Sequence, residues 1–201
     1  MRAVIWLLLV APKRVLGFEQ TRFVIGGGPD PPPTNDSYSN LNNAGVNFLH
    51  ADSNEISTAG QAQLMASLCS ANNLSCVVPF SAHKAVGTDS AVWGYFLRDE
   101  PKAPEWPELA ARVQQVRQLR PGALAFINLL GYVNETENPS LAKELYGLDT
   151  WGEYVDTYLA TVKPDVLSYD YYPDYSGQDQ FHFELGFMRN RSQHAGVPLW
   201  T

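Results

Sequence analysis

Short apolar runs alternate with helical patterns along most of this chain, and this alternation restricts the possible folds more than any other feature of the sequence. The runs predicted to be strands cover residues 23–26, 46–51, 76–80, 92–97, 124–130, 166–172 and 197–200. Strands that alternate with helices form a parallel sheet, because each helix returns the chain to the edge where the next strand begins. The sequence therefore predicts an α/β domain.

Start signals for helices lie between these strands. Thr58 with Gln61 and Thr150 with Glu153 each form a capping box. Only residues 81–90 separate the third predicted strand from the fourth. A parallel crossover normally needs a dozen or more residues, so we expect the helix at this point to be shortened or absent.

Polar and acidic side chains recur where the predicted strands end. They are His50, Asp52, Asp99, Glu100, Asn128 and Asp170. The carboxyl ends of parallel strands meet at one edge of a sheet, and ligands bind at that edge in α/β proteins. The recurrence is typical of a (β/α) barrel, and an open doubly wound sheet is the alternative.

The fourth strand gives the leading catalytic candidate. Its apolar run, 92–97, is followed directly by Arg98, Asp99 and Glu100, and then by Pro101. Two adjacent acids and an arginine are costly to hold at the end of a buried strand for packing alone. We interpret Glu100 as catalytic, with Asp99 raising its pKa because neighbouring like charges resist joint ionisation. The alternative is a solvated acid in a loop.

Three strand motifs are similar to those of a known enzyme group. They are Trp-Gly-Tyr-Phe-Leu-Arg-Asp-Glu-Pro at 93–101, Pro-Gly-Ala-Leu-Ala-Phe-Ile-Asn-Leu-Leu at 121–130 and Leu-Ser-Tyr-Asp-Tyr-Tyr-Pro at 167–173. In this order and at this spacing they resemble TIM-barrel glycoside hydrolases of the clan A type, in particular poorly characterised members with a Gly-Tyr-x-x-x-Asp-Glu-Pro motif on strand four.

The resemblance implies a hydrolase of O-glycosidic bonds with Glu100 as general acid/base. The clan usually has Asn where this chain has Asp99, and its nucleophile is a Glu at the end of strand seven, which has no counterpart before Thr201. Asp170 is therefore the candidate second catalytic carboxylate. The implied fold is a (β/α)8 TIM barrel over 18–201, incomplete, with about seven strands and truncated before its last one.

Six residues are candidates for substrate binding, since aromatic rings stack on sugars and polar groups bind hydroxyls. They are Asp99, Arg98, Asn128, His50, Tyr95 and Tyr172. The alternatives are core packing for the tyrosines, a loop-capping amide for Asn128 and a structural role for His50.

Two other functions remain open at this stage. One is a catalytically inactive barrel that still binds carbohydrate. The other is a metal-dependent, sugar-acting barrel using His50, Asp52, Glu100 and Asp170, although the spacing of these residues gives it no positive support. No cofactor and no metal site are predicted.

The amino terminus and four sequons indicate a secreted glycoprotein. Residues 1–17 combine Arg2, an apolar core and small residues at the end, which is typical of a signal peptide; a first buried strand is the alternative. N-glycosylation sequons begin at Asn35, Asn73, Asn134 and Asn190. Cys69 and Cys76 form either a disulfide or a pair of buried thiols.

Charge limits the choice of partners. The net charge is −7 over 201 residues, which does not attract nucleic acid or an anionic membrane. A mildly acidic chain with 12% aromatic residues suits a neutral, hydroxyl-rich ligand, and the expected partner is a carbohydrate.

Overall fold

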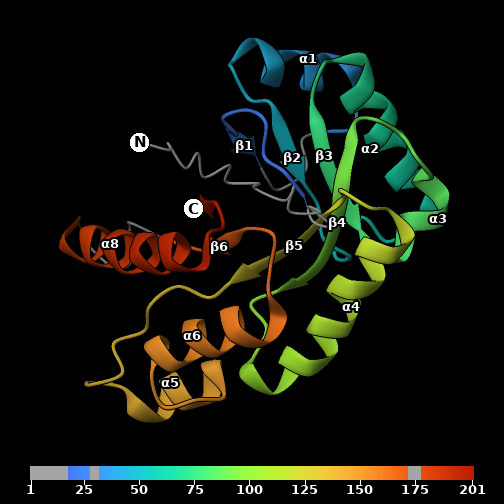
Figure 1. Ribbon diagram of the computed structural model, residues 1–201. Helices are drawn as coiled ribbons and strands as arrows, with labels where there is room; N and C mark the ends of the chain where they lie inside the picture. Colours follow the sequence, from blue (N-terminus) through green and yellow to red (C-terminus); the bar gives the residue numbers. More distant parts are fainter. Residues whose placement is uncertain (1–17, 28–31, 172–177) are drawn as a thin grey trace, which may run out of the picture.

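The computed structural model describes residues 18–27, 32–171 and 178–201. Seven strands in these residues form one parallel sheet in chain order (Figure 1). They are β1 (Gly26–Gly27), β2 (Phe48–His50), β3 (Ser75–Pro79), β4 (Val92–Asp99), β5 (Leu124–Leu129), β6 (Leu167–Tyr169) and β7 (Leu199–Trp200). The longest ladders join β3, β4 and β5, at the centre of the sheet.

The predicted TIM barrel is wrong. A barrel closes only when its first and last strands pair with each other. In the residues that the structure describes, β1 and β7 lie at the two ends of the sheet order, do not pair, and contribute two residues each. The sheet is a curled, parallel half-barrel. A doubly wound sheet is also wrong, because its strand order reverses at the centre and this order does not.

Helices surround the outer side of the curled sheet (Figure 1). They are α1 (Asn35–Asn43), α2 (Ala59–Ala71), α3 (His83–Val86), α4 (Trp106–Leu119), α5 (Pro139–Tyr146), α6 (Trp151–Val162) and α8 (Gln178–Ala195), with short 3₁₀ turns η1 (Phe80–Ala82) and η2 (Ala103–Glu105). The capping box of Thr58 and Gln61 is confirmed at the start of α2. The shortened crossover between β3 and β4 is also confirmed, since it holds only η1 and the four-residue α3.

The inner side of the half-barrel carries its own aromatic core. Phe48, Phe96 and Phe126 pack there with aliphatic neighbours from β3, from β5 and from the residue before β6. Residues 18–25 lie against the amino ends of the strands, where Phe18 packs on Trp93 with ring centroids 5.5 Å apart. The amino end of the inner side is therefore covered, and the carboxyl ends of the strands carry the polar side chains.

A second aromatic core fixes the loop that follows β4. Trp106 of α4 packs against Tyr154 and Tyr158 of α6, with ring centroids 5.2 Å apart in both pairs. The buried hydroxyl of Tyr154 donates a 2.7 Å hydrogen bond to the carbonyl oxygen of Pro101. The packing of α4 on α6 thus holds the backbone immediately after Glu100.

The remaining predictions concern processing and compartment. The predicted signal peptide, 1–17, lies outside the described residues. Cys69 and Cys76 are buried thiols and not a disulfide. None of the helices in the described ranges is long and apolar enough to cross a membrane. Secretion and glycosylation stay predictions.

Candidate functional site

The half-barrel brings side chains from three neighbouring strands together at its carboxyl edge. Parallel pairing places Asp99 of β4 beside Asn128 of β5, and Asn128 beside Ser168 of β6. Asp170 follows β6, and its amide donates a 2.9 Å hydrogen bond to the carbonyl oxygen of Leu129. The residues predicted from the ends of strands four, five and six therefore lie next to one another.

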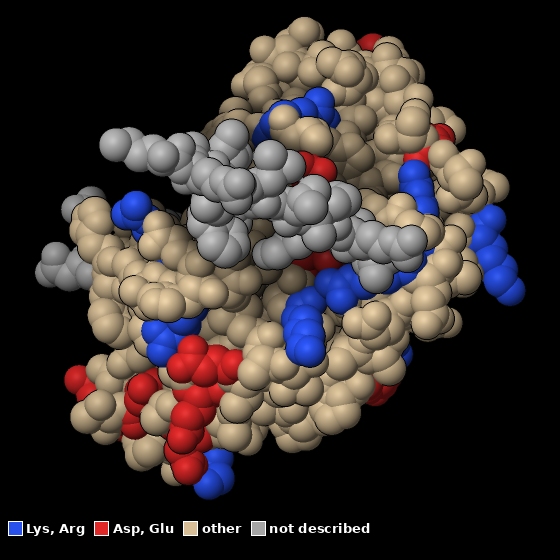
Figure 2. Space-filling model, in the orientation of Figure 1, with Lys and Arg blue, Asp and Glu red and all other residues tan. Residues whose placement is uncertain are grey.

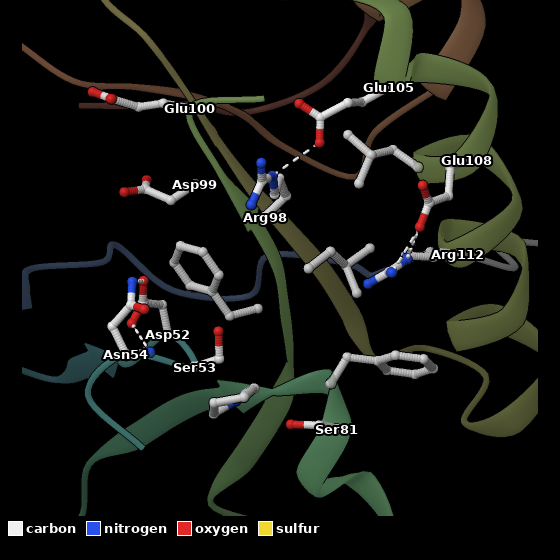
Figure 3. A pocket seen from close by; sticks show the side chains of 15 residues that line it. Asp52, Ser53, Asn54, Ser81, Arg98, Asp99, Glu100, Glu105, Glu108 and Arg112 are labelled. Carbon is white, nitrogen blue, oxygen red and sulfur yellow. Dashed lines mark hydrogen bonds and ion pairs between the residues drawn. The ribbon is translucent and has the colours of Figure 1, made fainter. Parts of the chain in front are cut away.

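Two cavities open beside this cluster. One has a volume of about 600 Å³ and lies between the loops after β2 and β3, the end of β4 and the start of α4; Asp52, Asp99 and Glu100 line it (Figure 3). The other has a volume of about 370 Å³ and lies on the inner side between β1 and β7; His50 and Asp170 line it. Glu100 and Asp170 are within hydrogen-bonding reach of each other, so their contact lies between the two cavities.

The backbone at Glu100 is held in an unusual conformation. Its φ is +41°, in the left-handed region, which costs a residue other than glycine about 1–3 kcal/mol. Its amide donates a 2.9 Å hydrogen bond to the carbonyl oxygen of Asn128, and Tyr154 holds the next residue as described above. This fixed turn directs the Glu100 side chain to the same side as that of Asp99 (Figure 3).

Glu100 keeps its proton to an unusually high pH. Partial burial of the carboxyl raises its pKa, the negative charges of Asp170 and Asp99 raise it further, and a hydrogen bond to Asp170 adds to the effect, so that the pKa of Glu100 is about 7. Near neutral pH the Glu100 carboxyl therefore still carries a transferable proton in part of the molecules. General acid catalysis requires such a group.

Replacement of Asp170 by asparagine is expected to lower the pKa of Glu100 from about 7 toward its ordinary value of 4.5, because the variant removes a neighbouring negative charge. Because a carboxyl group keeps its proton at pH values below its pKa, Glu100 should be mainly protonated at pH 6 in the wild type. In the variant it should be more ionised at that pH. A ¹³C NMR titration of the glutamate carboxyls measures this directly. Asp149→Asn, which removes an exposed charge paired with Lys143, is the control. An unchanged Glu100 titration in Asp170→Asn would contradict the assignment.

Asp99 has a more balanced environment. Burial raises the pKa of its carboxyl, a hydrogen bond from Asn128 lowers it, and the charges of Asp170 and Asp52 raise it again, while His50 lowers it. Asn128 Nδ2 donates this bond to Asp99 Oδ1 over 3.1 Å. The amide of Asn128 therefore favours the ionised form of Asp99.

Arg98 lines the larger cavity but is paired with Glu105 and not with Asp99 or Glu100. Its Nε lies 3.0 Å from a carboxylate oxygen of Glu105, and the two residues form an ion pair at the edge of the cavity (Figure 3). Arg112 is paired in the same way with Glu108, at 2.7 Å. Both arginines of this cavity thus already have a carboxylate partner.

The other predicted binding residues lie in different parts of the structure. His50 lines the smaller cavity, with its ring centroid 5.6 Å from that of Phe126. Tyr95 is only 3% exposed and packs with Phe80 in the outer core, so it lies away from both cavities. Tyr172 lies outside the described residues. Ser168 was not predicted; its hydroxyl bonds to Asn128 in the cluster.

The surface charge is unevenly distributed. Figure 2 shows a group of Asp and Glu side chains over α5 and α6, and Lys and Arg side chains beside α4. Part of the negative charge of this chain, whose net charge is −7, therefore lies on α5 and α6, away from the carboxyl edge of the sheet. In the described part of the chain no group of three or more His, Cys, Asp or Glu side chains is arranged to hold a metal ion. The metal-dependent hypothesis therefore has no ligand set there.

No family model, curated protein or solved structure matches this chain. We therefore infer its function from the geometry of the site.

Proposed function

We propose that this protein hydrolyses O-glycosidic bonds of a carbohydrate and that Glu100 is the general acid. The observation that carries the proposal is a carboxyl group at the end of β4, beside a cavity of about 600 Å³, with a pKa of about 7. A glycosidic oxygen is a poor leaving group unless it is protonated as the bond breaks. Glu100 has both the position and the proton for this step.

The proposed step is a transfer of the Glu100 proton to the glycosidic oxygen. The bond between this oxygen and the anomeric carbon breaks, and its electron pair stays with the leaving oxygen, which departs as an alcohol. Water then adds to the anomeric carbon and gives one proton back to the Glu100 carboxylate. The cavity suits a sugar because Asp52, Asn54 and Ser81 line it together with Asp99 and Glu100. Cavities of about 300–1,000 Å³ bind small molecules in proteins.

Asp170 is assigned a supporting role in this step. Retaining glycosidases hold their two carboxyls about 5–5.5 Å apart, and inverting enzymes hold them about 6.5–9.5 Å apart. Glu100 and Asp170 are within hydrogen-bonding reach, which is closer than either arrangement. In this geometry Asp170 keeps the proton on Glu100, and it does not face Glu100 across a sugar ring.

The contact between Glu100 and Asp170 favours a second candidate function, a protein that binds carbohydrate without cleaving it. Hydrolysis needs a second carboxylate opposite the acid to act on the anomeric carbon or on water. The contact between Glu100 and Asp170 places these two carboxyls together instead. Binding would use the same cavity and would not need the proton of Glu100.

One experiment separates the two candidates. A panel of oligosaccharides and 4-methylumbelliferyl glycosides is tested for turnover by released sugar, and for binding by isothermal titration calorimetry. Turnover that declines as the pH rises past about 7, where Glu100 loses its proton, is the result expected of a glycosidase. Binding without turnover supports the second candidate. If no sugar binds or reacts, both are wrong.

A further inference from the structure

A line of hydrogen-bonded side chains crosses three neighbouring strands at the carboxyl edge. Ser168 Oγ of β6 lies 2.9 Å from Asn128 Oδ1 of β5, and Asn128 Nδ2 lies 3.1 Å from Asp99 Oδ1 of β4. The strand register pairs Asp99 with Asn128 and Asn128 with Ser168, which brings the three side chains side by side. We call these three residues the relay.

The direction of every bond in the relay follows from its chemistry. An ionised carboxylate only accepts hydrogen bonds, so the Asn128 nitrogen must face Asp99 and the amide oxygen must face Ser168. The Ser168 hydroxyl then donates to that oxygen. Ser168 is 5% exposed and Asn128 is 9% exposed, so protein covers most of the surface of both residues. A reversed amide would direct its buried oxygen at the carboxylate, with a large cost.

We propose that Ser168 and Asn128 are positioning residues that fix the orientation of the Asp99 carboxylate and hold it in its ionised form beside Glu100. The catalytic meaning of the relay rests on the proposed function, but the relay itself does not. Asp99 Oδ1 is taken by Asn128, and Asp99 lines the larger cavity together with Glu100. In this scheme the main role of Asn128 is to orient Asp99.

The groups around Asp99 explain why the relay is needed to keep its carboxylate ionised. The charged groups that face Asp99 are Glu100 directly after β4, Asp170 after β6, His50 at the end of β2 and Asp52 in the loop that follows β2. Burial and the carboxylates raise the pKa of Asp99, and the bond from Asn128 opposes them more strongly than the charge of His50 does. Loss of that bond should protonate Asp99 at a higher pH. A protonated Asp99 no longer repels an ionised Glu100, so Glu100 should then lose its proton at a lower pH.

The test is a ¹³C NMR titration of the Asp99 and Glu100 carboxyls in Ser168→Ala, which removes the hydroxyl that orients the amide. The expected result is an upward shift of the Asp99 titration and a downward shift of the Glu100 titration, with a larger effect in Asn128→Ala. Ser168→Thr keeps the hydroxyl beside the smaller cavity, which Ser168 lines, and should restore both titrations.

Ser192→Ala is the matched control. Ser192 is also buried, at 6% exposure, and its hydroxyl donates a 2.9 Å bond to the carbonyl oxygen of Val197 at the far end of α8. This variant should lose similar stability and leave both titrations unchanged. The proposal is overturned if Ser168→Ala folds and titrates like the wild type, or if Ser192→Ala shifts the carboxyls equally. Absence of turnover in the wild type would defeat the proposed function but not these titrations.

Discussion

Glu100→Gln is expected to lower kcat/KM by about 10²–10⁴-fold on glycosides whose leaving group is an alcohol, because the amide has no proton to give to the leaving oxygen. The substitution keeps the size and shape of the side chain. It also removes the group whose pKa of about 7 sets the upper limit of the pH profile, so the residual activity should no longer decline near that pH. Initial rates from pH 5 to 9 measure both effects.

The leaving group separates loss of the acid from general damage to the site. A dinitrophenolate leaves without protonation, so Glu100→Gln should lose far less activity on dinitrophenyl glycosides than on glycosides of simple alcohols. The control is Glu108→Gln, which neutralises another glutamate that lines the same cavity but is paired with Arg112. It should retain nearly full activity. An equal loss on both kinds of substrate would show that Glu100 does not act as the acid.

The sequence predicted the strands of the sheet but not its closure. Apolar runs and helix signals identify strands and crossovers, because burial and capping are local properties. An open half-barrel and a closed barrel share the same alternation of strands and helices. They differ in whether the first and last strands pair, and in the described part of the chain β1 and β7 contribute two residues each. This is a property of tilt, register and edges, which no local pattern contains.

The sequence also predicted only some residues of the candidate site. Glu100 and Asp99 were predicted because acids after a buried strand are conspicuous in a sequence. The sequence left Tyr95 open between substrate binding and core packing, because β4 is apolar on both faces and its alternation gives no direction. Ser168 was missed because its role depends on the register between β5 and β6, which becomes visible only in three dimensions.

A buried ion pair between Asp165 and Arg117 lies at the amino ends of β5 and β6, opposite the candidate site. Asp165, with a side chain 3% exposed, accepts a 2.8 Å bond from Arg117 of α4 and a 3.1 Å bond from the amide of Ala125 in β5. Arg117 also donates to the carbonyl oxygen of Lys163, over 2.9 Å. One carboxylate thus links α4, the start of β5 and the turn before β6. Both of its oxygens have partners that depend on it.

Asp165→Ala is expected to lower the free energy of unfolding by about 3–5 kcal/mol, because it leaves the Arg117 charge and the Ala125 amide without a buried acceptor. This is a large part of the roughly 5–15 kcal/mol that stabilises a typical domain. Urea unfolding followed by circular dichroism measures this loss, and the urea midpoint should fall while the slope of the transition stays unchanged.

The control is Asp156→Ala, which breaks a two-bond pair with Arg191 on the surface, where the Asp156 side chain is 57% exposed. That loss should stay below about 1 kcal/mol. Similar losses in the two variants would mean that Asp165 contributes no more than a surface ion pair.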